Sequence, residues 1–458
     1  MANVIDSKIN LEKDSIPKLF FTYFIPSVCA MLALSTNTTI DGIFVGQKIG
    51  TDALAAVGIA WPIFPVIIAY ELLFSIGAAS LSSYYIGKGK AQKARMIFSS
   101  VFYFALVSAL VMGLVFYYFR YEMALFLGVS QTLLPLVVEY IGVIFLGGVF
   151  IVLQPLLDIF AINDRRPNLA MIAMIASSVI NIIFNYIFIF LLEWGLFGAA
   201  FATILGHIVG FFILLRHFIS RRGHIYFIRY FHIRAILVSA KNGVPQATSE
   251  VSASLMMLTF NHVLKEIVGD RGNSIYSIVM YIGIIVFTIL LSSAQGVQPI
   301  SSFNYGANRL ERVRAILKFG IFFSSIAGVI LYICSVFFDR YLIMLFLSQE
   351  DMHNDPMLLT DVSLAIRIYF IGFILLGFNF VVATLLQSIQ RPLNALIVTV
   401  SSTLIFAIPF VLILPKYFGI NGIWASYPLA MVCASFIAII VISYELRKGV
   451  LAQKEARQ

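Results

Sequence analysis

The sequence has few charged residues and few cysteines, and both shortages narrow what it can be. Only 12% of its 458 residues are charged and 60% are hydrophobic, so it has too little polar surface to coat a water-soluble protein of this length. The three cysteines stand alone in apolar segments, which excludes a CxxC metal site and a disulfide framework. We expect buried packing thiols at Cys29, Cys334 and Cys433.

Motifs for enzymatic chemistry and nucleotide binding are also missing. The chain contains no HExxH, no GxSxG and no GxxxxGKS/T sequence. We therefore expect that it is not an enzyme, that it uses no metal or cofactor, and that ATP bound to this chain does not supply its energy. An ion gradient is the remaining source of energy.

Long apolar runs dominate the sequence. Windows of about 20 apolar residues, the length that crosses a bilayer as a helix, occur twelve times. They cover residues 18–45, 54–83, 96–119, 135–160, 169–192, 196–218, 240–264, 274–302, 315–338, 362–388, 393–414 and 420–444. The predicted fold class is an all-α integral membrane protein with twelve transmembrane helices.

The two halves of the chain repeat each other. Pro26 matches Pro245 at an offset of 219, Pro167 matches Pro392 at 225, and the GLFG sequence from Gly195 matches GING at 224. A repeat this long indicates duplicated bundles, and six helices in each copy return the chain to its starting side. We predict two six-helix lobes, related by a pseudo-two-fold axis along the membrane normal.

The basic residues predict which ends of the helices are cytoplasmic. With a cytoplasmic N-terminus, seven of the 31 lysines and arginines fall outside, leaving 24 inside. The seven are Lys48, Arg120, Lys265, Arg271, Arg340, Arg367 and Lys416. The net charge of +9 then reflects topology and anionic inner-leaflet lipid, and requires no nucleic-acid partner. We predict a cytoplasmic leader at 1–17, an N-lobe at 18–218, a basic cytoplasmic linker at 219–239, a C-lobe at 240–444 and a cytoplasmic tail at 445–458.

One carboxyl group stands out inside the first apolar segment. A charge at the bilayer centre costs about 2.5 to 3.5 kcal/mol on insertion scales, so Asp41 is a candidate functional residue. Asn37 lies one helical turn earlier on the same face. Asn181 and Asn185 repeat this four-residue spacing in the fifth segment, and Thr203 lies in the sixth. We expect these residues to meet within one lobe.

Other polar residues permit two interpretations. Glu71 and Glu250 also lie at membrane depth, and we predict that they and Asn37 line an acidic substrate cleft; a structural role for either glutamate stays open. Asp158, Asp164 and Glu139 are expected at helix ends, where solvent or capping explains them. His207 is expected to be a helix-contact histidine rather than a metal ligand or proton relay.

Five fragments of the sequence together are typical of one transporter family. They are IPS with TTIDGIFVG (Ile25–Gly46), YYIGKGKAQKA (Tyr84–Ala94), NIIFNYIFIF (Asn181–Phe190), GLFGAAFAT (Gly195–Thr203) and GINGIWAS (Gly419–Ser426). With these fragments in family order, the chain from about Phe20 to Glu445 resembles the MATE family, the multidrug and toxic-compound extrusion transporters. The resemblance implies a V-shaped pair of lobes around a central cleft. It also implies a proton-coupling site at Asp41, Asn181, Asn185 and Thr203, and a bend at Pro26.

Two departures from the family pattern bear on the coupling ion. The fifth-helix motif of the family often reads Asn-x-x-x-Asp-Pro, whereas this chain has Asn185-Tyr186, and residues 373–387 lack the acid of sodium-coupled members. Proton coupling is therefore favoured, and sodium remains open.

The function expected from the sequence is an inner-membrane antiporter that exports amphipathic, often cationic, compounds. We expect a monomer whose partners are a small-molecule substrate and membrane lipid. The alternative is a flippase for lipid-linked precursors of the same wider superfamily. A flippase predicts further helices and cationic cleft residues for a pyrophosphate, whereas the membrane-depth charges here are acidic.

Overall fold

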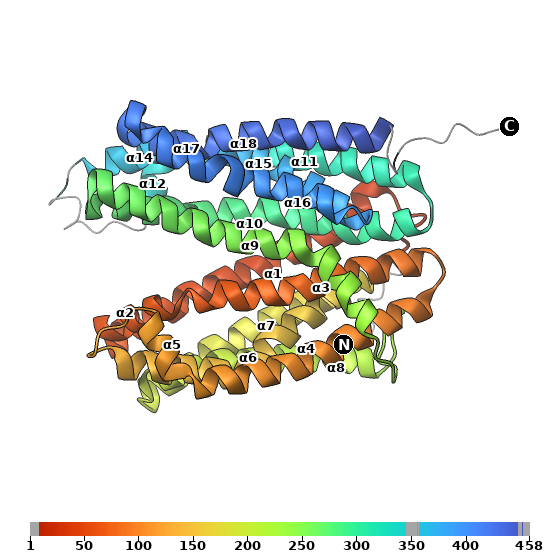
Figure 1. Cartoon of the computed structure of the whole chain (residues 1–458), viewed down its shortest axis with the longest axis horizontal. Helices are drawn as coiled ribbons and strands as arrows, with labels where there is room; N and C mark the ends of the chain where they lie inside the picture. The colour runs from red at the N-terminus through yellow and green to blue at the C-terminus, as the bar shows by residue number, and fades with distance from the viewer. Residues whose placement is uncertain (1–8, 345–354, 356, 448–450, 452–458) are drawn as a thin grey trace. The chain divides into compact units, whose positions relative to one another are not determined.

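The computed structural model describes residues 9–344, 355, 357–447 and 451, and all regular elements in these ranges are helices. They divide into two compact units. The N-terminal unit consists mainly of Ile25–Ala247, and the C-terminal unit combines Leu11–Phe24 with the described residues from Thr248 onward. Within each unit the long helices run side by side (Figure 1).

The N-terminal part of the chain contains α1 (Ile16–Phe44), η1 (Val45–Ile49), α2 (Thr51–Ala60), α3 (Ile63–Gly87), α4 (Ala91–Tyr118), α5 (Arg120–Phe126), α6 (Leu134–Asn163), α7 (Pro167–Asn185), η2 (Tyr186–Leu191) and α8 (Gly195–Ile219). The second half contains α9 (Ile233–Val268), α10 (Asp270–Gly306), α11 (Leu310–Phe337), α12 (Asp339–Met344), α14 (Leu358–Tyr369), α15 (Ile371–Ser388), α16 (Pro392–Val400), η3 (Ser401–Ala407), α17 (Ile408–Ile413) and α18 (Pro415–Arg447). The elements written η are π-helical continuations of α-helices.

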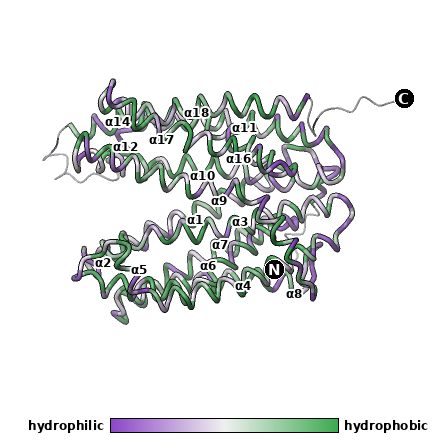
Figure 2. Tube along the Cα trace, viewed as in Figure 1, coloured by the Kyte–Doolittle hydropathy of each residue, from purple (hydrophilic) through white to green (hydrophobic). Residues whose placement is uncertain are grey.

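The predicted membrane segments are confirmed as helices. Eleven helices in the described ranges are long and apolar enough to cross a membrane. The twelfth predicted segment, 240–264, lies inside the 36-residue helix α9, whose composition is more polar. Hydrophilic residues gather mainly at helix ends and turns (Figure 2). The predicted all-helical membrane fold is therefore correct, whereas the predicted lobe, linker and tail boundaries stay predictions.

The backbone repeats at the offsets that the sequence shows. Left-handed or positive-φ residues occur in four matching pairs: Gly50 and Gly269, Gly89 and Asn308, Arg165 and Gln390, and Gly195 and Gly419. The offsets are 219, 219, 225 and 224. In the last pair φ is 59° and 57°, a region that glycine enters without steric cost. The two halves therefore turn at equivalent places.

Helix packing is repeated as well. In the N-terminal unit α6 packs against α3, α4 and α8, and α7 packs against α8. In the C-terminal unit α15 packs in the same way against α10, α11 and α18, and η3 packs against α18. The two units therefore contain the same arrangement of packed helices.

The first helix of each copy is divided between the units. The N-terminal part of α9 packs on α3, where a Cβ atom added to Gly77 would lie 2.0 Å from the Ser239 carbonyl oxygen. The N-terminal part of α1 packs on α10, where a Cβ at Gly296 would lie 3.4 Å from the Phe20 ring. Gly296 and Gly77 are 219 residues apart, as are Ser239 and Phe20. The division is therefore part of the repeat.

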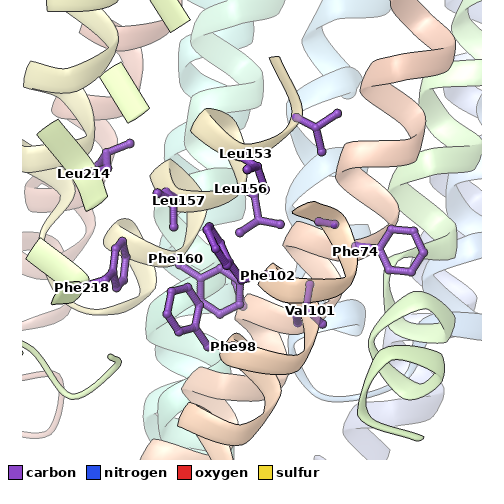
Figure 3. Packing of buried hydrophobic residues seen from close by; sticks show 14 of the residues in the cluster. Phe74, Phe98, Val101, Phe102, Leu153, Leu156, Leu157, Phe160, Leu214 and Phe218 are labelled. Atoms are coloured by element: carbon purple, nitrogen blue, oxygen red, sulfur yellow. The ribbon is translucent and has the colours of Figure 1, made fainter. Parts of the chain in front are cut away.

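The core of the N-terminal unit is a cluster of buried aromatic and aliphatic side chains. The Phe98 ring lies 4.7 Å from the Phe160 ring and 4.8 Å from the Phe218 ring, joining α4, α6 and α8 (Figure 3). Lipid tails are as apolar as these rings, so close packing between the helices, rather than removal from water, stabilises the cluster. This packing holds α6 and α8 together, and these two helices carry part of the candidate site.

The expectation of buried cysteines is wrong. Cys29 and Cys334 are exposed and Cys433 is half-buried. Large apolar side chains are exposed in the same way, including Phe126 at 89% and Tyr118 at 76%. In water such a surface would be unfavourable, but in a bilayer it faces lipid tails. A thiol is only weakly polar, so a cysteine side chain can face lipid at little cost.

Candidate functional site

Asp41 lies in the second half of α1 and is partly exposed. Asn185 of α7 donates a hydrogen bond from its Nδ2 to the Asp41 Oδ1, at 2.6 Å. The same nitrogen lies 3.0 Å from the Oδ1 of Asn181. Asn181 in turn donates from its Nδ2 to the Thr203 Oγ1 of α8, at 3.1 Å. The structure thus brings all four predicted coupling residues into one hydrogen-bonded chain.

α7 and α8 lie close enough together for these hydrogen bonds to form. A Cβ atom at Gly206 would lie 2.7 Å from the Ser177 carbonyl oxygen and 3.2 Å from the Asn181 Cβ. Any larger residue would separate the helices, because backbone atoms cannot move away cheaply. Gly206 is three residues after Thr203, on the same face of α8. The glycine therefore lets the Thr203 hydroxyl reach Asn181.

The environment of Asp41 combines polar contacts with burial. Asn181 is 2% exposed and Asn185 is fully buried. Tyr140 on α6 is 8% exposed and lies close enough for the Asp41 charge to act on it. Sequence reasoning missed Tyr140, because a tyrosine in an apolar run carries no sign of its neighbours. Asp41 therefore has amide donors on one side and a phenol within electrostatic reach.

Comparison with known proteins identifies the family. The MatE family model matches residues 26–187 and 245–413, once in each half. The chain belongs to the MatE family. Relatives named multidrug export protein MepA include one from Staphylococcus haemolyticus (strain JCSC1435), 23% identical over 97% of this chain and 96% of the relative. Another, from Staphylococcus aureus (strain NCTC 8325 / PS 47), is 25% identical over 95% of each chain.

Solved structures share the fold of this MatE chain. One is the outward-facing conformation of a multidrug resistance MATE family transporter of the MOP superfamily. It has a TM-score of 0.89 and 23% identity, and the match covers 96% of this chain and 98% of that one. A second is a MOP superfamily transporter from Pyrococcus furiosus Vc1 (DSM3638), with a TM-score of 0.88, 23% identity and the same coverage. Its binding pocket is described as having reverse polarity that suggests a different function.

The other predicted site residues of the MatE chain are not members of this hydrogen-bonded chain. Asn37 is half-buried on α1, and its Oδ1 is buried without a hydrogen-bond partner among the described residues. Glu71 is only 4% exposed, within α3. Glu250 is partly exposed on α9. Pro26 lies inside α1, next to the point where the chain passes between the units. Their predicted roles remain predictions.

Asp158 and His207 form a second polar group in the N-terminal unit. The interpretation of Asp158 as a helix-end residue is wrong, because α6 continues to Asn163 and Asp158 is 3% exposed. Its Oδ2 accepts a hydrogen bond from Gln154, whose Oε1 lies 2.8 Å from the His207 Nδ1. His207 does contact a neighbouring helix, as expected. Glu139 is exposed near the start of α6.

Asp164 holds the segment that follows α8 in place. It caps α6, is 4% exposed and accepts hydrogen bonds from the His217 Nε2 at 2.8 Å and the His224 backbone N–H at 2.8 Å. Burial lowers the pKa of the His224 imidazole, and the charges of Arg165 and Arg95 lower it further against the opposing effect of Asp164. The His224 imidazole therefore loses its proton more readily than that of a free histidine.

Proposed function

We propose that this MatE chain is a secondary active antiporter that exports amphipathic, often cationic, compounds in exchange for protons, with sodium as the alternative coupling ion. The observation that carries the proposal is the chain of hydrogen bonds from Asp41 through Asn185 and Asn181 to Thr203. The names of the MepA relatives and of the outward-facing structural neighbour support multidrug export. A single carboxyl group with amide partners suits reversible proton binding.

The amide partners fit both protonation states of Asp41. An ionised carboxylate only accepts hydrogen bonds, and the Asn185 Nδ2 donates to it. A protonated carboxyl also donates, and two candidate acceptors are the Asn185 Oδ1 and, one turn earlier on α1, the Asn37 Oδ1. Both oxygens are buried without hydrogen-bond partners among the described residues. Protonation thus exchanges one hydrogen-bond arrangement for another and removes a costly charge from membrane depth.

The proton gradient supplies enough energy for export. One proton crossing about 100 mV releases roughly 2.3 kcal/mol, and one pH unit adds about 1.4 kcal/mol. Together these sustain a concentration ratio of several hundred, since about 1.4 kcal/mol is a factor of ten. Transport requires that proton binding and substrate binding favour opposite conformations. Asp41 is the residue that we assign to the first of these events.

Sodium is the alternative because the same chain of residues offers oxygen ligands. One carboxylate, two amide oxygens and a hydroxyl are the donors that hard cations prefer.

We propose an inner-membrane location with both termini cytoplasmic, as the lysine and arginine distribution predicts. Glu250 is our candidate for attracting cationic substrates, since the sequence has no lysine or arginine between Lys241 and Lys265. Acidic membrane-depth residues favour cations over a pyrophosphate-bearing lipid.

Transport assays on proteoliposomes test the coupling assignment. The full-length protein is reconstituted, and uptake of a fluorescent permanent cation is followed under an imposed proton gradient and separately under a sodium gradient. Asp41→Asn keeps the shape and hydrogen-bonding capacity of the side chain but cannot bind a proton. We expect it to abolish gradient-driven transport, while Glu122→Gln, at an exposed acid on α5, behaves as wild type. Proton-driven transport retained by folded Asp41→Asn protein contradicts the assignment.

A further inference from the structure

The connecting segment, residues 219–234, joins α8 to α9 and is fixed against one end of the N-terminal unit. Asp164, at the end of α6, accepts a hydrogen bond from the His224 backbone N–H at 2.8 Å. Ser99 of α4 accepts another through its Oγ, from the Ile228 backbone N–H at 2.9 Å. Helices α4 and α6 therefore hold a largely non-helical piece of chain in a defined path, and its exposed side chains have defined positions.

The connecting segment exposes a dense group of positive charges. Its exposed arginines are Arg221, Arg222, Arg229 and Arg234. Within the described part of the chain, none of these four forms an ion pair with a carboxylate. Arg95 of α4 adds a fifth charge: its guanidinium lies 4.0 Å from the Tyr226 ring centroid, and that of Arg221 lies 5.2 Å from the same centroid. The sequence has no acidic residue between Glu193 and Glu250, so the segment cannot neutralise itself.

Apolar side chains are exposed among these arginines. Ile219 is 63% exposed, Phe231 58% and Ile233 57%. Segments that lie in the plane of a membrane interface have this composition, because their apolar side chains enter the boundary of headgroups and acyl chains while their arginines face the phosphates. A nucleic acid or a soluble anion would bind the charges but leave the apolar side chains in water. The combination favours a lipid.

The equivalent segment before α1 contains its own counter-charges. It lies against the start of α11, which corresponds to α4 in the repeat, and Arg309 donates a hydrogen bond from its Nη2 to the Glu12 Oε2 at 2.5 Å. At the offset of 219, Glu12 corresponds to Phe231 and Asp14 to Ile233. Where the segment before α1 has two acids, the connecting segment thus has two exposed apolar residues. The positive charge of the connecting segment is not a requirement of the repeated fold.

We propose that the connecting segment is a binding site for an anionic phospholipid, in which its arginines bind the headgroup phosphate and its exposed apolar side chains contact the acyl region. A guanidinium group can donate two parallel hydrogen bonds to a phosphate. The segment lies on the side of the membrane that we assign to the cytoplasm, where the leaflet contains anionic lipid. The proposal uses that orientation from the proposed function and no step of transport. A bound lipid would hold the start of α9 at the membrane surface.

Native mass spectrometry of the full-length protein tests the proposal. The protein in a neutral detergent is titrated with phosphatidylglycerol and, separately, with phosphatidylcholine, and the bound lipids are counted. Glycerophosphoglycerol, which is the same headgroup without acyl chains, and an RNA oligonucleotide are added as competitors. One variant combines Arg221→Gln, Arg222→Gln and Arg229→Gln. A second variant, Phe231→Glu with Ile233→Asp, introduces the acids of the segment before α1.

The matched control combines Lys265→Gln, Arg340→Gln and Lys416→Gln, which removes the same charge from exposed positions in the C-terminal unit. We expect the wild type and this control to bind phosphatidylglycerol more tightly than phosphatidylcholine, and the two test variants to bind phosphatidylglycerol roughly tenfold or more weakly. Gel filtration verifies folding, and the second variant decides the question if the first does not fold.

The proposal is overturned by an equal loss in the control, which would reflect net charge alone, or by a wild type without preference for phosphatidylglycerol. Displacement of the lipid by RNA, or by glycerophosphoglycerol at the concentration of the lipid, overturns it as well, because neither competitor has acyl chains. Failure of the proposed function is distinct: it consists of proton-driven transport by Asp41→Asn, which leaves the count of bound lipids unchanged.

Discussion

Asn181 is the residue on which the candidate site depends most. Its Oδ1 accepts a hydrogen bond from Asn185 and its Nδ2 donates one to Thr203, so one amide links the acid-bearing α1 side of the site to α8. Only a side chain with both a donor and an acceptor can make this connection. The hydrogen bond to Asn181, one turn away, therefore holds Asn185 in its orientation toward Asp41.

Asn181→Leu tests this positioning role. Leucine has a similar volume but neither bond, and losing hydrogen bonds that support a charged group costs about 1.5–3 kcal/mol. We expect proton-driven transport to fall roughly ten- to a hundred-fold, since about 1.4 kcal/mol is a factor of ten. Asn379→Leu, at a buried asparagine of the C-terminal unit, is the control. Equal losses in both variants would indicate general damage from removing a buried amide.

Single residues were only partly predictable from the sequence. The four-residue spacing of Asn181 and Asn185 correctly indicated a shared helix face, because that spacing is a local property. Tyr140 and Asp158 were missed or misinterpreted for the opposite reason. Their contacts depend on which helices pack on α6, and the predicted segment ends at 160, whereas α6 continues to Asn163.

At the scale of elements, α3 and α9 of the N-terminal unit cross at very short range, and each helix has a glycine at the contact. A Cβ atom at Gly77 would lie 2.0 Å from the Ser239 carbonyl oxygen, and one at Gly243 would lie 1.9 Å from the Leu73 carbonyl oxygen. Both obstacles are backbone atoms, so neither contact can be relieved by a rotamer change. The two helices can pack this closely only because each presents a glycine.

Gly77→Ala should therefore destabilise the protein. Overpacking of this kind costs about 1–3 kcal/mol, and we expect a lower melting temperature for the detergent-purified protein and a similar loss for Gly243→Ala. Gly148→Ala is the control, because a Cβ there meets nothing within 4 Å and alanine favours the helix. An unchanged melting temperature in Gly77→Ala would show that the helices separate at little cost.

Element boundaries were less predictable than element types. Apolar length identified the spans, because lipid imposes it directly. The start of α9 at Ile233, seven residues before the predicted segment at 240, was missed, since its basic, polar beginning resembles a linker. That part packs on α3 through Gly77, a tertiary contact that hydropathy does not encode. The π-helical continuations at Tyr186–Leu191 and Ser401–Ala407 carry no sequence signal that we recognise.

At the scale of the whole molecule, duplication explains most of the architecture. The offsets of 219 and 224–225 recur in the backbone turns, in the helix contacts and in the way the first helix of each copy is divided. The copies nevertheless differ in chemistry. Asp41 corresponds to Phe260, Glu71 to Leu290 and Asp158 to Ala383, so these ionisable groups lie in one copy. The proposed coupling residue Asp41 therefore has no acidic counterpart in the second copy.

Duplication with an even number of helices per copy makes a prediction about orientation. Gly50 and Gly269 occupy equivalent turns after the first helix of each copy, so both should lie on the same side of the membrane, opposite the linker. The lysine and arginine bias places that side outside. We expect reporters fused after Gly50 and Gly269 to be active as external alkaline phosphatase. Fusions after Gly223 and Gln453 should instead fluoresce as cytoplasmic green fluorescent protein. Each site receives both reporters, so that every result has its own control. With a cytoplasmic N-terminus, a cytoplasmic signal at Gly269 would require an even number of crossings before it instead of seven, and the two copies would then have opposite orientations.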